Sequence, residues 1–410
     1  MARESVLYSF AGAPDAASPF GGLLAGKHGE FYGISNGGGT VGPSGFSGGT
    51  VYEVSSTGQE KVLYDFQGGN DGAGSEATPI ADRAGNLFGV TSFGGSGACT
   101  NGCGTVFEMQ PNGSGFTERV LCAFAGGQDG ADPVGSLVLG KNGVLYGTTN
   151  VGGGGARNAP SLASGCGTVF SLTPSGSQYT EKVIYSVQGG SDGESSRATL
   201  IADSSGNLYG PTLYGGKSKS ACGKSNEGIA SCGLIFEITR SGHEKILYKF
   251  DGGKHHGSNP RTALLPLSNG SFVSLTIFGG PSNLGTAYEL IPTSGGTYTE
   301  RVVHFFAPTM DGFHPEDADG LVEDASGNLY GTTVGSSISP CGCGTVFELT
   351  PNASGYTEKV LHAFNGAGDG VNPRSSVTFH DGVMYGTTYA GGCYCYGSSY
   401  SCGVVYKVRP

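Results

Sequence analysis

Several signatures of well-known protein classes are missing from this chain of 410 residues. It contains no HExxH zinc motif, and its glycines do not follow a strand and open a helix, as phosphate-binding loops require. No segment approaches the roughly 18 consecutive apolar residues of a membrane span. Only 13% of the residues are charged, and Trp is absent, which removes one common sugar-stacking side chain. The sequence therefore argues against a zinc protease, a nucleotide-binding protein and a membrane-spanning protein.

Basic residues are scarce as well, with 22 Lys and Arg against 33 Asp and Glu and a net charge of −11. Nucleic acids and anionic membranes would repel such a protein as a whole, so we expect no nucleic-acid partner. Gly is abundant instead, at 78 residues, together with 19 Pro. Because 37% of the residues are hydrophobic and few are charged, the chain can bury a core and charge-driven disorder is excluded.

The glycines follow an internal repeat, which decides the fold. A hexapeptide of the form Gly-[Thr/Val/Leu]-hydrophobic-aromatic-x-hydrophobic occurs seven times, for example as GTVFEM and GTVFEL. The copies start at Gly49, Gly104, Gly167, Gly233, Gly285, Gly344 and Gly403, so they lie 52 to 66 residues apart. In each unit, turn-forming residues separate four short segments, one of which alternates apolar and polar residues like a half-buried strand. Such units are typical of propeller blades.

The repeat predicts an all-β fold, a seven-bladed β-propeller of four-stranded blades that forms a single domain over residues 1–410. The chain begins with a strand of the fourth type at residues 6–10 and ends with one of the third type at residues 403–408. We therefore expect the N-terminal strand to complete the C-terminal blade and close the ring. The glycines would then provide tight turns and close contacts between blades.

The repeat unit GNLYGTT…GGxxxxGTVFELTPxGxxYTEKVLYSF resembles the GloVer tandem repeat, of the Gloeobacter/Verrucomicrobium type, of secreted bacterial proteins. The resemblance covers essentially the whole chain and implies an exported propeller. It carries no settled activity and assigns no catalytic residue. The fifth blade departs most from the pattern, because NGSFVSLTIFGG at residues 269–280 replaces GNLYGTT and KHHG at residues 254–257 replaces the xDG of the preceding loop.

Eleven cysteines favour an oxidising compartment, so we expect a secreted or cell-surface protein. Most of them lie just before the third strand of a unit or in the loop that leads to it. Cys99 is expected to pair with Cys103, and Cys222 with Cys232. The connectivity of the C-terminal group cannot be deduced from the sequence, and this group comprises Cys341, Cys343, Cys393, Cys395 and Cys402.

Zinc is an alternative to disulfides at two places, because CGC at residues 341–343 and CYC at residues 393–395 bring thiolates close together. The CxxC spacing of zinc ribbons is absent, so disulfides are preferred and no metal ligand is predicted. Cys122 occupies a position that is Tyr in four other units and is expected to be a buried free thiol. His304 and His362 occupy the same position, where we expect them to pack inside an outer strand.

The candidate catalytic residues lie in loops that join the outermost strand of one blade to the innermost strand of the next. In propellers these loops surround one mouth of the central channel, which is the usual binding face. They contain His255, His256, His314 and Asp317. Most of these loops also carry the Asp of an xDG sequence, which we interpret as a turn-capping residue. A structural cation such as calcium is a weaker alternative, because the ligand series of a calcium loop is missing.

The candidate substrate-binding residues are those that break the repeat at the entrance to the innermost strand. Arg197, Arg261 and Arg374 occupy this position in three blades, and Lys254 lies near by in sequence. Guanidinium groups match carboxylate, sulfate and phosphate, so this rim predicts an anionic ligand. Three aromatic residues that follow the second strand of a blade can offer stacking platforms, namely Tyr214, Phe278 and Tyr389.

Two functions of different classes fit these features. The first is an extracellular hydrolase or lyase that acts on an acidic polysaccharide or oligosaccharide at the channel mouth, without a cofactor. Paired carboxylates would serve hydrolysis, and a His or Tyr beside an Arg-neutralised carboxylate would serve β-elimination. The second is a non-catalytic surface propeller that binds a glycan or a protein. The asymmetry of blades 4 to 7 favours the enzyme, and we expect a monomer.

Overall fold

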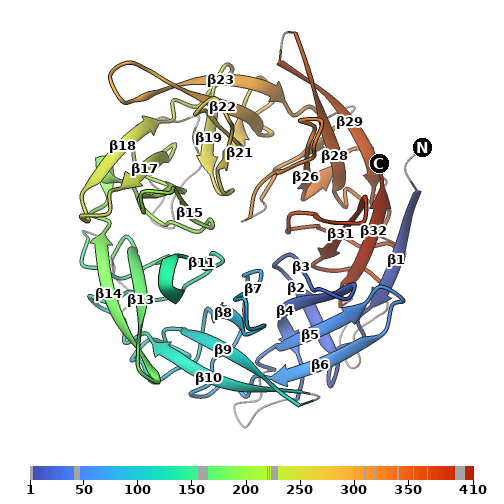
Figure 1. Cartoon of the computed structure of the whole chain (residues 1–410). Helices are drawn as coiled ribbons and strands as arrows, with labels where there is room; N and C mark the ends of the chain where they lie inside the picture. Colours follow the sequence, from blue (N-terminus) through green and yellow to red (C-terminus); the bar gives the residue numbers. More distant parts are fainter. Residues whose placement is uncertain are drawn as a thin grey trace.

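The computed structural model describes residues 3–40, 47–113, 115–155, 165–218, 220, 222, 230–308, 311–316, 319–338, 341–353, 355–366, 368–392 and 402–410. In this part of the chain, short antiparallel strands form seven blades around a common centre, and each blade presents its first strand to that centre (Figure 1). The predicted all-β, seven-bladed propeller of four-stranded blades is thus confirmed.

The strands of the first three blades run from the centre outwards in chain order. Blade 1 comprises β2 (Ala16–Pro19), β3 (Leu24–Ala25), β4 (Glu30–Gly38), β5 (Thr50–Ser55) and β6 (Glu60–Asp65). Blade 2 comprises β7 (Ile80–Ala81), β8 (Leu87–Thr91), β9 (Thr105–Asn112) and β10 (Gly115–Ala123). Blade 3 comprises β11 (Val138–Leu139), the turn η1 (Lys141–Gly143), β12 (Leu145–Thr149), β13 (Thr168–Ser175) and β14 (Gln178–Ser186).

The next three blades repeat this order. Blade 4 follows the turn η2 (Gly190–Asp192) and comprises β15 (Ile201–Ala202), β16 (Leu208–Thr212), β17 (Leu234–Ile238) and β18 (Glu244–Lys249). Blade 5 comprises β19 (Gly257–Pro260), β20 (Leu265–Pro266), β21 (Phe272–Gly279), β22 (Thr286–Pro292) and β23 (Tyr298–Phe305). Blade 6 comprises β25 (Val322–Glu323), β26 (Leu329–Thr333), β28 (Thr345–Asn352) and β29 (Gly355–Ala363), beside the small pair β24 (Gly312–Phe313) and β27 (Gly335–Ser336).

Blade 7 contains both ends of the chain. It comprises β30 (Thr378–His380), β31 (Val383–Thr388) and β32 (Val404–Arg409), and its outermost strand is β1 (Arg3–Ser9). β1 pairs antiparallel with β32, with Glu4 opposite Val408 and Ser9 opposite Val404. The two strands lie side by side in Figure 1. The predicted closure of the ring by the N-terminal strand is therefore confirmed.

The third strand of each blade is buried on both faces because a neighbouring blade covers each of them. In β9, every residue from Thr105 to Met109 is buried. Gly104, which precedes this strand, has φ +95°, and a Cβ added there would lie 2.5 Å from a ring carbon of Pro133 and from the carbonyl oxygen of Thr91. Only Gly fits this close approach between blades, which accounts for the first residue of the repeated hexapeptide.

Aromatic rings form the core of the contacts between blades. At six of the seven contacts, a Phe that follows an outermost strand packs edge-on against the third-strand aromatic ring of the next blade, with centroids 5.0 to 5.3 Å apart. The pairs are Phe10–Tyr52, Phe66–Phe107, Phe124–Phe170, Phe250–Tyr288, Phe306–Phe347 and Phe364–Tyr406. Between blades 3 and 4 the corresponding residue is Val187. The same packing unit thus closes nearly every contact.

Disulfides link residues within loops, as the cysteine spacing predicts. The predicted pairs Cys99–Cys103 and Cys222–Cys232 are confirmed, and Cys341 pairs with Cys343. Cys393 and Cys395 lie outside the described residues. Cys122 is a free thiol, but it is half-buried rather than buried, because it lies on an outermost strand; burial of its sulfur raises the pKa of the thiol to about 12.

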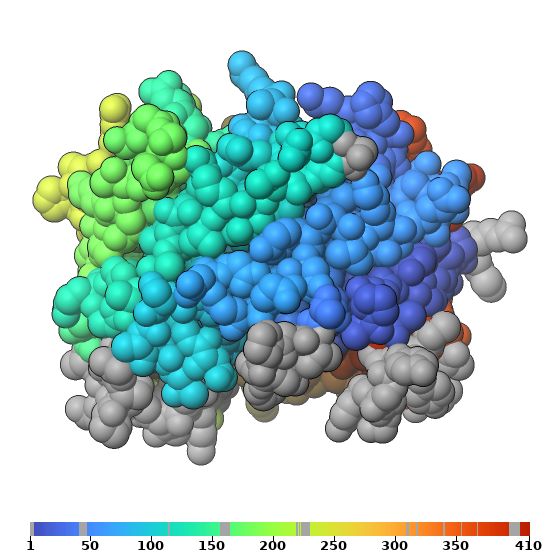
Figure 2. All heavy atoms as spheres, turned by 90° about the horizontal axis from the view of Figure 1, so that it is seen from below, coloured from blue at the N-terminus to red at the C-terminus, as the bar shows by residue number. Residues whose placement is uncertain are grey.

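Seen from the side, the wall of the ring is formed by the outer strands, which slant across blades 1 (blue), 2 (cyan) and 3 (green) in Figure 2. Part of the expected alternation is present in β14, where exposed and half-buried residues alternate over residues 178–183. Within the described residues, no helix has the length and apolar character needed to cross a membrane.

Candidate functional site

Five charged side chains from five blades form a chain of ion pairs at the centre of the ring, which we call the axial network. Arg197 and Arg261 each place an Nη2 atom 3.3 Å from Oε2 of Glu76. Arg261 also places Nη1 3.4 Å from Oε2 of Glu316, and Arg374 lies 3.2 Å from the same oxygen. Each residue lies in the segment that leads into or along the innermost strand of its blade, so the propeller brings them together.

The axial network carries more positive than negative charge and is mostly sheltered from solvent. The Arg261 side chain is only 10% exposed, whereas the other four are 20 to 25% exposed. Burial, followed by the nearby Arg197, lowers the pKa of Arg261. The Nε atoms of the three arginines are buried and donate no hydrogen bond to the described residues. Three arginines against two glutamates leave the network one positive charge and several donors for a ligand.

Two aromatic rings border the axial network on the side of blades 1 and 7. Phe20 and Tyr389 meet edge-on, with their centroids 5.9 Å apart. The guanidinium carbon of Arg374 lies 5.0 Å from the Phe20 centroid and 5.6 Å from that of Tyr389, and Arg261 lies 5.5 Å from Phe20. These are cation–π distances, so the rings fix the arginines and offer apolar surface beside them.

A second polar cluster crosses the axis further along the innermost strands. Asp319 of blade 6 accepts hydrogen bonds from Ser136 Oγ at 2.7 Å and from Thr199 Oγ1 at 2.8 Å, and also from the hydroxyl of Thr78. Thr78 and Thr199 each follow an axial-network residue by two positions, so they point to the same side of the chain. Side chains from different blades therefore meet near the axis twice, once in the axial network and once around Asp319.

Sequence reasoning missed Glu76 and Asp319 as site residues, and it included Glu316 only as part of the segment 314–317 that was considered as an acid/base group. Glu76 occupies the same repeat position as the three predicted arginines, so this alignment was the signal that could have identified it. Glu316 lies next to the predicted Asp317, which is outside the described residues. Asp319 stands where other blades have a small residue such as Gly135 or Ala198, a break in the pattern that the sequence alone could not link to hydroxyl groups across the ring.

The predicted residues of the KHHG loop do not join the axial network. Lys254 and His255 are exposed. His256 Nδ1 lies 2.7 Å from Oε2 of Glu300, on the outermost strand of blade 5, and Glu300 also accepts a 2.8 Å hydrogen bond from the Gly257 N–H. Burial raises the pKa of Glu300, although these hydrogen bonds oppose the shift. The structure thus places His256 in the contact between blades 4 and 5, away from the three arginines.

Of the other predicted residues, His314 and Phe278 pack against each other, whereas Tyr389 lies at the axial network. His314 packs edge-on against Phe278, with centroids 5.2 Å apart, and its Nδ1 lies 3.0 Å from the carbonyl oxygen of Ile277. Because a carbonyl only accepts, Nδ1 donates, and a neutral ring presents Nε2 as its acceptor. His314 precedes Glu316 by two residues. Tyr214 forms a backbone bridge with Glu194, whereas Tyr389 contacts the axial network as described above.

The Asp residues of the xDG loops cap turns, as predicted. Asp71, for example, accepts a 2.8 Å hydrogen bond from the N–H of Gln67 and a 3.1 Å bond from the hydroxyl of Tyr64. Each such Asp also faces a Glu on the outermost strand of the following blade. These carboxyl pairs are Asp15–Glu60, Asp71–Glu118, Asp129–Glu181, Asp192–Glu244, Asp311–Glu358 and Asp369–Glu4. Glu300 and His256 replace the pair between blades 4 and 5.

The carboxyl pairs change the titration of their glutamates. Burial, followed by the facing Asp, raises the pKa of Glu60 and Glu118 to about 7 and that of Glu358 to about 8. Two carboxylates side by side in a half-buried contact repel each other, so one of them keeps its proton. The pairs therefore belong to the contacts between blades and stabilise them as long as that proton remains bound.

A cavity of about 1090 Å³ opens at the other end of the innermost strands. It is bounded by the turns that follow β7, β11 and β15, and Arg83, Lys141 and Arg240 line it. None of the predicted site residues borders it. The cavity and the axial network therefore occupy opposite ends of the innermost strands.

The fold and the axial network define a seven-bladed β-propeller with a cluster of charged side chains across its axis. The chain belongs to the Gloeobacter/Verrucomicrobia repeat family, whose model matches residues 2–219 and again residues 220–410. The resemblance found in the sequence is thereby confirmed. No relative is found among curated protein sequences.

Solved structures resemble the chain in fold at low sequence identity. A proposed 6-phosphogluconolactonase from Bacteroides uniformis aligns with a TM-score of 0.50 and 12% identity, over 84% of this chain and 86% of its own. A gluconolactonase from Xanthomonas campestris aligns with a TM-score of 0.43 and 12% identity, over 100% of this chain and 89% of its own. An aldose sugar dehydrogenase from Streptomyces coelicolor aligns with a TM-score of 0.44 and 12% identity, over 100% of this chain and 99% of its own. At these identities the likeness concerns the fold alone.

Proposed function

We propose that this protein is an extracytoplasmic carbohydrate-active enzyme, a hydrolase or lyase that binds an acidic saccharide at the axial network. The observation that carries the proposal is the convergence of three arginines from three blades, with one net positive charge, in a protein whose total charge is −11. A carboxylate or sulfate of the ligand would accept hydrogen bonds from the guanidinium groups. The disulfides within its loops are consistent with an oxidising compartment.

The ligand would enter by exchanging partners with a glutamate. Arg374 is 25% exposed and bonds Glu316 through one nitrogen, so its remaining donors can receive a ligand anion. Phe20 and Tyr389 would contact an apolar face of the sugar, as aromatic rings do in the absence of Trp. Arg261, held between both glutamates, would fix the distance between them.

The chemistry would use the groups that surround the bound anion. For hydrolysis, Glu76 and Glu316 would be the two carboxyl groups on either side of the scissile bond. For β-elimination, the arginines would neutralise a uronate carboxylate while Glu316 or the Nε2 atom of His314 removes the proton from the adjacent carbon. A carbon–carbon double bond would form as the C–O bond to the leaving sugar breaks, and the leaving oxygen would take a proton from water. In this proposal Glu76 and Glu316 take the roles that the sequence assigned to His255 and His256.

The similar propellers support this proposal only through the class of ligand. The name of the Bacteroides uniformis protein refers to an acidic sugar derivative. An acidic saccharide at the arginines of this chain would belong to the same broad chemistry.

The test is a panel of acidic and neutral polysaccharides, assayed for new reducing ends and for the absorbance of unsaturated uronates. We expect at least one acidic polysaccharide to be cleaved and Arg374→Ala to lower kcat/KM on it at least tenfold. Arg240→Ala removes an arginine at the opposite end of the innermost strands and should leave the rate unchanged. Equal rates for Arg374→Ala and the wild type would refute the site.

A non-catalytic glycan-binding propeller is the second candidate, and one observation favours it. Each glutamate of the axial network already binds two arginines, which suits static recognition of an anion better than proton transfer. Calorimetric binding of an acidic oligosaccharide that yields no product, together with loss of binding in Arg374→Ala, would select this function and reject the enzyme.

A further inference from the structure

One contact between blades differs from the others in the donor atoms that it brings together. Between blades 6 and 7, Glu4 of β1, His362 of β29 and Asp369 of the following loop each direct one ligand atom into the same space, and these atoms all lie within 4.8 Å of one another. Across the described residues, no other group of three His, Cys, Asp or Glu side chains meets this limit.

We propose that Glu4, His362 and Asp369 form a binding site for a divalent transition-metal ion, with Zn²⁺ as the best match. One imidazole nitrogen and two carboxylate oxygens form a donor set that zinc accepts, with water completing the tetrahedron. Calcium prefers six to eight oxygen ligands and would not favour an imidazole. The site is separate from the axial network and independent of the proposed function.

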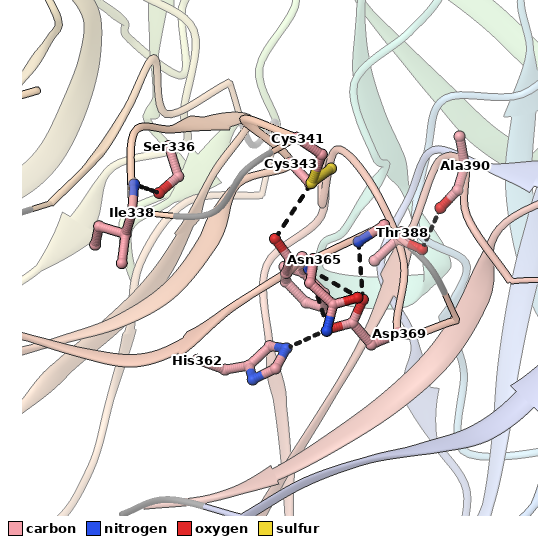
Figure 3. The surroundings of a disulfide bond; sticks show 11 residues. Ser336, Ile338, Cys341, Cys343, His362, Asn365, Asp369, Thr388 and Ala390 are labelled. Carbon is pink, nitrogen blue, oxygen red and sulfur yellow. Dashed lines mark hydrogen bonds and ion pairs between the residues drawn. A yellow bond between two sulfur atoms is a disulfide. The ribbon is translucent and has the colours of Figure 1, made fainter.

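Two of the three ligands are held in position by their surroundings. Asp369 accepts hydrogen bonds of 3.1 Å from the backbone N–H groups of Asn365 and Gly366, and its Oδ2 lies 3.1 Å from His362 Nε2. The His362 ring packs edge-on against Phe364, with centroids 4.7 Å apart. Figure 3 shows His362, Asn365 and Asp369 next to one another, close to the Cys341–Cys343 disulfide. The two backbone N–H groups that donate to Asp369 are outer partners of the kind that orient metal ligands.

The third ligand has an unused oxygen. Glu4 Oε1 is buried and accepts no hydrogen bond from the described residues. A metal ion would satisfy this buried oxygen and would neutralise the facing carboxylates of Glu4 and Asp369.

The repeat shows why this contact, and not the others, gains a metal site. In three contacts a tyrosine hydroxyl donates to the Asp, as Tyr64 does to Asp71, and a protonated phenol is a poor metal ligand. His362 replaces that tyrosine by a nitrogen donor. His304 does so too, and its Nε2 lies 3.1 Å from Asp311, but with Glu358 it does not form an equally compact group. His304 therefore supplies a matched control.

A metal ion here would also fasten the ring. Glu4 lies on the strand that closes blade 7, whereas His362 and Asp369 belong to blade 6 and its outgoing loop. Binding would thus tie the N-terminal strand to the neighbouring blade and raise the melting temperature of the metal-loaded protein.

The experiment uses untagged full-length protein, stripped with a chelator and titrated with ZnCl₂ by calorimetry. We expect one zinc ion per chain and a rise in Tm of about 3 °C or more at saturation. Co²⁺ should give a tetrahedral visible spectrum without sulfur-to-metal charge transfer, which separates this site from thiolate binding. CaCl₂ at the same concentration should not compete.

Two substitutions decide the assignment. His362→Tyr restores the residue found in other blades and should keep the Tm of the stripped protein while zinc affinity falls at least tenfold. His304→Tyr should bind zinc like the wild type. The proposal is overturned if His362→Tyr still binds one zinc with unchanged affinity, or if the wild type binds none.

Discussion

The centre of the ring and the contacts between its blades both collect acidic side chains, but they neutralise them in opposite ways. On the axis, Glu76 and Glu316 each bind two arginines. Between the blades, glutamates such as Glu118 face an aspartate, and burial beside that carboxylate raises the pKa of Glu118 to about 7. On the axis, the glutamates are neutralised by arginines that occur at positions where the sequence breaks the repeat. Between the blades, the glutamates are neutralised by protons, and these residues are part of the repeat itself.

The difference separates the residues that maintain the fold from those that can serve a ligand. The carboxyl pairs recur because every contact needs the same turn and the same packing, so they belong to the repeated structure. The arginines occur in three blades only and converge on one point, as a ligand site with a single orientation requires. Four changes test this difference: deletion of the N-terminal strand, removal of an axial arginine, removal of a titrating carboxyl group between two blades, and removal of an exposed histidine.

The largest effect is expected from deleting residues 1–10, which removes β1 and Phe10 from the contact between blades 7 and 1. The loss of stability should exceed the ~3–5 kcal/mol that truncation of a single buried Phe costs. Thermal and urea unfolding measure it, and the peptide of residues 1–10 added in trans should restore part of the loss. An unchanged Tm would contradict the closure of the ring.

The next effect is expected from Arg261→Met, which leaves Glu76 and Glu316 without their shared cation. Glu76 keeps Arg197 and Glu316 keeps Arg374, so the cost is that of the lost charge-assisted hydrogen bonds, about 2 kcal/mol. Urea unfolding at pH 7 measures the loss.

Lys217→Ala is the control, because its side chain is 47% exposed beside Asp251, which is itself 29% exposed, and the pair should contribute little. Equal effects of Arg261→Met and Lys217→Ala would show that the axial network does not hold the ring together.

A smaller effect of opposite sign is expected from Glu118→Gln. An unfolded Glu loses its proton near pH 4.5, whereas folded Glu118 keeps it to about pH 7. The unfolded state therefore binds fewer protons over this interval, so stability is full below pH 4.5 and falls as the pH rises to 7. Gln can donate to Asp71 without titrating, so the variant should melt at a higher temperature than the wild type at pH 8 and at the same temperature at pH 4.5.

Asp381→Asn changes an acidic residue whose side chain is 92% exposed, and it serves as the control that should not alter the pH profile. If Glu118→Gln lowered the Tm at pH 8, the ionised pair would be stabilising and the interpretation of the contacts would be wrong.

The smallest effect is expected from His255→Ala. His255 is exposed, so its replacement should change the free energy of unfolding by less than about 0.5 kcal/mol. Its effect on saccharide cleavage is also expected to be small, because His255 does not join the axial network. A tenfold loss of kcat with unchanged Tm would instead restore His255 to the catalytic site.

The sequence was sufficient for the fold because local and long-range signals agree in each unit. In the hexapeptide that begins at Gly104, the glycine requires the close approach of a neighbouring blade, and the strand that follows is buried on both faces. A ring of blades meets these two requirements for all seven copies of the hexapeptide. The mismatch of the chain ends was enough to predict the pairing of β1 with β32.

The site was predicted less completely, because it depends on distances across the ring. The alignment of repeats found Arg197, Arg261 and Arg374, but it could not show that Glu76 and Glu316 lie between them. The sequence predicted catalytic histidines in the KHHG loop, whereas in the structure His256 takes the place of the turn-capping Asp and pairs with Glu300 of the next blade. Such a role can be recognised only when the position of the neighbouring strand is known.

The most direct test of the contrast between axis and contacts is a proton titration of the native and the urea-unfolded protein, with chelator present. The pKa of Glu4, Glu60 and Glu118 reaches about 7, and that of Glu244 and Glu358 about 8. Near pH 6 these five glutamates should therefore hold about five more protons in the native protein than in the unfolded chain, one for each of them. Superimposable titration curves would contradict the proton-sharing pairs between the blades.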